Sequence, residues 1–105
     1  MTGKDSKRLL LELEKIRRDM NREIMNPVIP ELSLASMRPL ITLAARARLA
    51  YLQALMDLAK QPPETPSQEQ ITLLGRRRET YEELRAAVNA LETAIDRGYL
   101  DVVGA

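Results

Sequence analysis

Two arginines stand where the surrounding pattern calls for apolar residues. Arg48 lies in the middle of the apolar stripe of segment 36–60, and Arg77 interrupts an apolar seam that runs from Leu74 to Ile95. A guanidinium group is costly to bury alone, so each must meet a carboxylate or lie at a wet interface. The two could line an anion pocket, or each could form an ion pair that fixes helix register. The absence of a phosphate-binding loop favours the ion pair. The candidate partners are the carboxylates that flank the stripes: Glu12, Glu23, Glu82, Glu92 and Asp96.

A second group of arginines could contact the phosphates of nucleic acid. It comprises Arg76 and Arg78 in the third long segment, and Arg17 and Arg18 in the first. Proteins that bind phosphate backbones usually carry a clear basic excess, whereas this chain has a formal net charge of only +1. Glutamates follow the third segment's arginines at once, and Arg78 can pair with a glutamate one turn later. The pattern therefore favours solvated helix faces over a nucleic-acid site.

Residues 67–84, SQEQITLLGRRRETYEEL, resemble the helix-turn-helix of bacterial transcription regulators. In that arrangement Gly75 would form the turn, and Arg78, Thr80 and Tyr81 would begin the helix that reads DNA. The resemblance implies a small DNA-binding transcriptional regulator. The same residues also fit one long helix, because the apolar seam continues through the glycine, which costs only about 1 kcal/mol inside a helix.

Enzymatic chemistry has few residues to use. The chain contains no His and no Cys, which removes the imidazole base, the thiolate nucleophile, the disulfide and the zinc knuckle. We therefore expect no catalytic residue, no metal ligand and no cofactor. The enzymatic alternative is a small all-helical mutase-like protein in which Arg48 and Arg77 form the anion pocket.

The composition predicts an all-α protein. The apolar residues are mainly Leu, Ile, Ala and Met, without Phe or Trp, and β-branched runs are missing. Apolar periodicity predicts a three-helix antiparallel bundle with long, coiled-coil-like helices in a single domain spanning residues 1–105. The expected segments are helices at about 6–25, 36–60 and 66–97, a proline-containing connection at 26–35, a break at 61–65 and a short apolar tail at 98–105.

Local signals mark the helix ends. Ser36 is the expected N-cap of the second helix, because this choice leaves Pro39 in the first turn, where a missing donor costs little. The connection before it is apolar enough that we expect it to pack across the helices. The third helix begins at residues 65–66, or at Ser67 with Gln70 as its capping-box partner. Gly98 is a natural left-handed stop.

The middle helix is apolar around most of its circumference, so we expect it to be covered from two directions. Its neighbours in the chain cover one side, and a partner covers the other. A two-fold dimer is the simplest assembly, and a heterologous helical protein is the alternative. The expected interface residues are Leu40, Leu43, Ala47, Leu49, Leu52, Ala54 and Met56. This pattern predicts a non-catalytic interaction protein: an adaptor, assembly factor or regulator.

Membrane insertion is not expected. The most apolar helix carries Arg46, Arg48, Gln53 and Asp57, which do not suit a membrane span. The first ten residues, MTGKDSKRLL, lack the apolar core of a signal peptide. We therefore expect a cytoplasmic protein.

Overall fold

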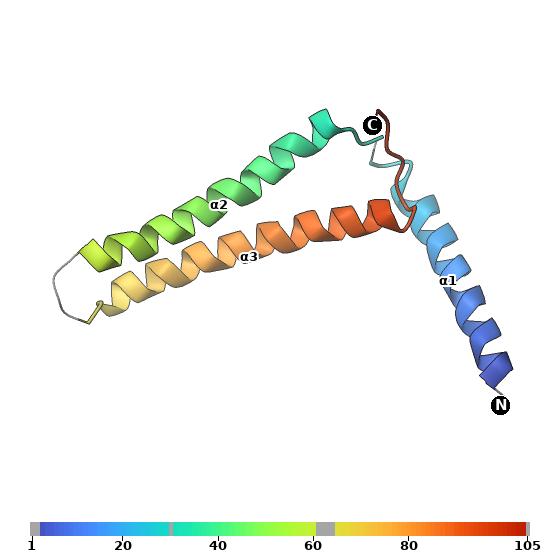
Figure 1. The fold of residues 1–105 in the computed structure, drawn as a ribbon, viewed down its shortest axis with the longest axis horizontal. Helices are drawn as coiled ribbons and strands as arrows, with labels where there is room; N and C mark the ends of the chain where they lie inside the picture. Colours follow the sequence, from blue (N-terminus) through green and yellow to red (C-terminus); the bar gives the residue numbers. More distant parts are fainter. Residues whose placement is uncertain (1–2, 30, 61–64, 105) are drawn as a thin grey trace. The chain divides into compact units, whose positions relative to one another are not determined.

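A computed structural model describes residues 3–29, 31–60 and 65–104. It contains three helices: α1 (Gly3–Met25), α2 (Leu34–Lys60) and α3 (Gln68–Asp96) (Figure 1). The described residues form no strand, only one isolated parallel bridge between Leu32 and Val102. The predicted all-α class with three long helices is confirmed. The predicted break at 61–65 falls mostly on residues 61–64, outside the described residues.

The chain's internal contacts divide into two compact units, and the expected single domain spanning residues 1–105 stays a prediction. The first unit comprises Met1–Leu34 and Leu91–Ala105, and the second comprises Ala35–Ala90. The first therefore contains α1, the connection after it, the last turns of α3 and the tail. The second contains nearly all of α2 and most of α3. Each unit is described separately below.

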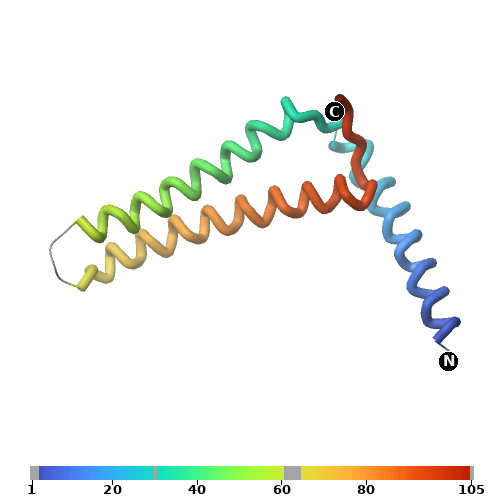
Figure 2. Tube along the Cα trace, in the orientation of Figure 1, coloured from blue at the N-terminus to red at the C-terminus, as the bar shows by residue number. Residues whose placement is uncertain are grey.

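In the second unit, α2 and α3 lie side by side and run antiparallel (Figures 1 and 2). On each helix the half-buried and buried side chains recur at alternating steps of three and four residues, which places them on one face. The α2 members of this seam are Met37, Leu40, Ala44, Ala47, Tyr51, Ala54 and Leu58. The α3 members within the unit are Leu74, Tyr81, Leu84 and Val88. Arg77, predicted to share the α3 seam, is exposed instead.

Helix α2 begins earlier than expected. Its first residue is Leu34, so Ser33, another residue type favoured at N-caps, takes the preceding position in place of Ser36. Pro39 then lies inside the helix rather than in its first turn. The proline has no N–H to donate to the carbonyl four residues before it, so α2 lacks one bond of its backbone ladder near its start.

A capping box begins α3. The backbone N–H of Ser67 donates to Gln70 Oε1 at 2.8 Å, and the backbone N–H of Gln70 donates to Ser67 Oγ at 3.2 Å. Of the two predicted starts, the one at Ser67 is the one observed. These bonds satisfy two N–H groups that a helix start would otherwise leave without partners.

A glycine ends α3 in the predicted way. Gly98 has a φ of 77°, a left-handed conformation that costs residues with a Cβ about 1 kcal/mol or more. Its N–H donates to the Ile95 carbonyl at 3.0 Å, and the Tyr99 N–H donates to the Ala94 carbonyl at 2.9 Å. This pair of bonds is a Schellman motif, and it turns the chain back so that Tyr99 becomes buried.

The tail and the connection together form the core of the first unit. Its buried residues are Leu32, Ala94, Tyr99 and Leu100. The Leu32 N–H donates to the Asp101 carbonyl at 3.0 Å, and the Val103 N–H donates to the Leu32 carbonyl at 2.8 Å. The expected packing of the connection therefore holds at Leu32. It fails at Val28 and Leu34, which are 78% and 72% exposed.

Candidate functional site

Helix α2 has a second apolar side that nothing in its unit covers. Its large side chains are between 47% and 60% exposed, and at 100° per residue they fall beside the seam on one side of the helix: Ile41, Leu49, Leu52, Leu55 and Met56. Arg48 lies among them. We call these six residues the α2 outer face. A helix with apolar residues on two sides is typical of a buried element, so this face is the strongest candidate for a binding surface.

The structure separates the seven predicted interface residues into two groups. Leu40, Ala47 and Ala54 lie on the seam that faces α3, the side of α2 that the chain itself covers. Leu49, Leu52 and Met56 lie on the α2 outer face, and Leu43 is exposed on the opposite edge of the seam. The apolar arc of this sequence is too wide to show which part of it α3 would occupy.

Arg48 is held by a tyrosine. Its Nε and Nη2 donate to the Tyr81 hydroxyl at 3.0 and 2.5 Å, and its Cζ lies 5.1 Å from the centre of the Tyr81 ring. The Tyr81 ring stacks on Tyr51 with 6.3 Å between centroids and 25° between planes. No described carboxylate pairs with Arg48, and its predicted place at a wet interface stays a prediction. The exposed guanidinium stays hydrated, so a phenol oxygen and a ring face are enough to hold it.

The remaining predicted arginines are all exposed. The Arg77 side chain forms no hydrogen bond or ion pair with any described residue, so its predicted carboxylate partner is also absent from the described residues. Arg76 and Arg78 lie in the second unit, whereas Arg17 and Arg18 lie on α1 in the first. The expected pairing of Arg78 with Glu82 is not formed.

Instead, Glu82 accepts a hydrogen bond from Arg85 at 2.8 Å, and this bond raises the pKa of the Arg85 guanidinium above its ordinary value. Arg78 and Arg85 are both within one turn of Glu82, but a pair whose acid precedes its base is the more favourable order on a helix, and only Arg85 follows Glu82.

No turn occurs at Gly75. Helix α3 is continuous from Gln68 to Asp96, and Gly75 is not among the glycines with a positive φ. The helix-turn-helix geometry implied by residues 67–84 is therefore not formed. The uninterrupted seam outweighs the small helical cost of a glycine. DNA binding by the exposed arginines stays a prediction.

Helix α1 exposes an apolar stripe along its length. None of its residues is buried, and the stripe residues are between 43% and 66% exposed: Leu9, Leu13, Ile16, Met20 and Ile24. We call these five residues the α1 stripe. It is a second candidate for a helix-binding surface, since such a stripe is normally covered in a folded protein.

A polar cluster joins the end of α1 to the tail. Arg22 Nη2 donates to Asp101 Oδ1 at 2.7 Å, and its Nη1 donates to the Gly98 carbonyl at 3.1 Å. Asn26 Nδ2 donates to Asp101 Oδ2 at 3.1 Å. The hydrogen bond from Arg22, and to a smaller extent that from Asn26, holds the pKa of the Asp101 carboxyl below its usual range. Sequence reasoning missed this cluster, for which the one signal was a single carboxylate inside an apolar tail.

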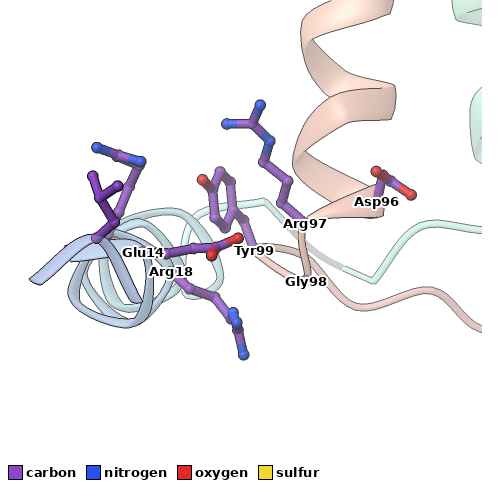
Figure 3. Close-up of a pocket in the computed structure, with 8 residues that line it drawn as sticks. Glu14, Arg18, Asp96, Arg97, Gly98 and Tyr99 are labelled. Carbon is purple, nitrogen blue, oxygen red and sulfur yellow. The ribbon is translucent and has the colours of Figure 1, made fainter. Parts of the chain in front are cut away.

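A groove of about 790 Å³ lies between α1 and the end of α3 within the first unit (Figure 3). Its charged lining residues are Glu14, Arg17, Arg18, Asp96 and Arg97. Figure 3 shows that the side chains of Arg18 and Arg97 point in opposite directions and that Asp96 points away from α1. The charges therefore do not converge on a common point, as an anion site would require.

Among residues 3–29, 31–60 and 65–104, no cluster of acidic side chains suits a metal ion. None of the helices in this part of the chain has the length and apolarity needed to cross a membrane. Comparison of the whole chain with models of known protein families, with curated proteins and with solved structures gives no match.

Proposed function

We propose that this chain is a non-catalytic helical interaction protein, an adaptor, assembly factor or regulator, that packs the α2 outer face against another helical chain. A second copy is the simplest partner. The observation that carries the proposal is the exposure of Ile41, Leu49, Leu52, Leu55 and Met56 on a helix whose other apolar side already faces α3.

Energetic reasoning supports association through this face. Full burial of a Leu, Ile or Met side chain contributes about 1.5–3 kcal/mol, so five half-exposed side chains offer a substantial driving force. The entropy lost on association offsets part of this gain. The outward residues of α3 from Arg76 to Thr93 include no exposed large apolar side chain. The apolar surface of the pair is thus concentrated on α2, apart from Ile71 and Leu73 at the start of α3.

Light scattering of three proteins tests the proposal. The unmodified chain and Ala86→Glu, which adds a carboxylate on the exposed side of α3, are expected to be dimers at high and low salt. Leu52→Glu is expected to be a monomer that keeps its helical circular dichroism, because it places a carboxylate in the centre of the outer face. A monomeric unmodified chain, or a Leu52→Glu variant with unchanged mass, would contradict the proposal.

A further inference from the structure

The α2 outer face and the α1 stripe match each other in length, in spacing and in charge. From this match we propose that α1 of a second copy is the occupant of the α2 outer face. In the resulting pair, α1 of each copy lies on the α2 outer face of the other copy. The inference rests on the proposed function and names its partner.

The lengths and spacings agree first. Leu9 and Ile24 on the α1 stripe are fifteen residues apart, and so are Ile41 and Met56 on the outer face, so each surface extends about 22 Å at 1.5 Å per residue. Leu9, Leu13, Ile16 and Met20 follow steps of four, three and four. The same steps separate Leu49, Leu52 and Met56 of the outer face from one another and from Ala45, which is exposed on the same side of α2. Equal periods allow the side chains of two helices to interdigitate along their whole contact.

The charges are complementary. On a helical wheel, one edge of the α1 stripe carries four of the five carboxylates of α1: Asp5, Glu12, Asp19 and Glu23. Glu12, Asp19 and Glu23 are exposed and form no ion pair with any described residue. On α2, Arg48 lies within the outer face, on the side next to the seam. Arg46 lies beyond the opposite edge of the face, away from the seam. Neither arginine has a carboxylate partner among the described residues.

The same charges disfavour direct pairing of α2 with α2 of a second copy. Such a contact would bring two Arg48 side chains together, and the outer face contains no carboxylate to separate them. Asp57 is the acidic residue of α2. It lies outside the outer face, with its Oδ1 3.9 Å from Lys60 Nζ. Like charges facing each other in an interface cost several kcal/mol, whereas α1 presents its carboxylates along one edge of its stripe, where they can face one of the two arginines with opposite charge.

Reciprocal exchange also satisfies both surfaces at once. Each copy offers one α1 stripe and one α2 outer face, so a two-fold pair forms two identical contacts and leaves no further stripe exposed to recruit a third copy. An open head-to-tail chain leaves one surface exposed at each end and a closed dimer leaves neither, so the closed dimer is expected.

A charge exchange between two variants of the full chain tests this arrangement. The first variant, Glu12→Lys with Asp19→Lys, puts positive charge on α1 opposite the unchanged arginines of α2. The second, Arg46→Glu with Arg48→Glu, puts negative charge on α2 opposite the unchanged acids of α1. Each variant alone is expected to raise the dimer dissociation constant at least about a hundredfold. An equimolar mixture is expected to restore dimers containing one chain of each, because both contacts regain opposite charges.

Matched controls separate this effect from net charge. Glu14→Lys with Glu83→Lys and Arg76→Glu with Arg78→Glu change the net charge by the same amounts at exposed sites away from both surfaces. Alone or mixed, these controls are expected to dimerise like the unmodified chain. Sedimentation equilibrium and circular dichroism give the masses and helical contents of all samples.

The results distinguish this inference from the proposed function. If the α1 variant still dimerises like the unmodified chain while Leu52→Glu does not, the outer face is an interface but α1 is not its occupant, and the inference is overturned. Recovery of dimers only in the mixture of the two interface variants supports α1 as the occupant. A mixture that stays monomeric overturns it.

Discussion

Arg22 and Asp101 form an ion pair of 2.7 Å although 79 residues of sequence separate them. This contact, together with the Leu32 bridge to the tail, closes the first unit around the end of α1. The tail is thus a structural part of its unit. The contact also makes the ionisation of Asp101 a sensitive probe of whether the unit is formed.

The first prediction concerns pH. Because the hydrogen bonds from Arg22 and Asn26 lower the pKa of Asp101 from its ordinary 3.8, the charged form is favoured in the folded protein. The charged Asp101 carboxylate contributes to the free energy of unfolding above pH 3.8. This contribution is lost as the pH falls through the lower pKa of the folded state. Arg22→Gln is expected to bring the pKa of Asp101 back towards its ordinary value in an NMR titration. An unchanged pKa would mean that Arg22 does not hold the carboxylate.

Gly75, inside α3, and Gly98, just after its end, are expected to respond in opposite directions to substitution by alanine. Gly75 has no positive φ and nothing within 4 Å of an added Cβ, so Gly75→Ala is expected to stabilise the protein by about 0.5–1 kcal/mol. At Gly98, with a φ of 77°, Gly98→Ala is expected to destabilise it by about 1–2 kcal/mol. Urea unfolding measures both. A destabilising Gly75→Ala would indicate a turn at that position after all.

The Tyr81 hydroxyl and ring both contact the Arg48 guanidinium, and two substitutions separate their contributions to stability. Tyr81→Phe removes the acceptor of two Arg48 hydrogen bonds and leaves the ring that stacks on Tyr51. Since Arg48 is exposed, we expect a loss near the lower end of the hydrogen-bond range, about 0.5 kcal/mol. Tyr81→Ala also removes the stacking and seam packing, and is expected to cost about 2 kcal/mol or more. If thermal unfolding shows the same loss of stability for both variants, the Tyr81 hydroxyl and not its ring stabilises the contact between Arg48 and Tyr81.

The fourth prediction concerns the start of α3. Ser67→Ala removes the acceptor for the Gln70 N–H and is expected to cost about 1 kcal/mol. Ser67→Asn keeps an acceptor there and serves as the control, with a change of a few tenths of a kcal/mol. Similar unfolding midpoints for the alanine and asparagine variants would contradict the capping box.

The elements of this fold that follow from local chemistry could be predicted from the sequence. The α3 seam, the capping box at Ser67 and the left-handed stop at Gly98 depend only on residues close together in the chain. The start of α2 was misplaced because Ser33 and Ser36 are both good N-caps, and local propensity does not decide between them.

Contacts between distant residues could not be predicted in the same way. The bonds from Arg22 and Asn26 to Asp101 need the connection and the tail to meet at Leu32, and no periodicity marks that meeting. The sequence leaves two environments open for Arg48, a carboxylate partner or a wet interface, and does not show that the exposed side chain bonds to the Tyr81 hydroxyl 33 residues away. The wide apolar arc of α2 indicated two covered sides without showing that Ala47 and Ala54 belong to the inner one.

Solvent protection at position 52 shows whether a partner covers the α2 outer face, because the chain contains no cysteine and a single introduced thiol can be followed alone. Rates of alkylation are compared for Leu52→Cys on the α2 outer face and Glu83→Cys on the exposed side of α3. If a partner covers the outer face, the thiol at position 52 reacts several-fold more slowly than the thiol at position 83, and dilution to the monomer removes the difference. Equal rates at every protein concentration would contradict the account.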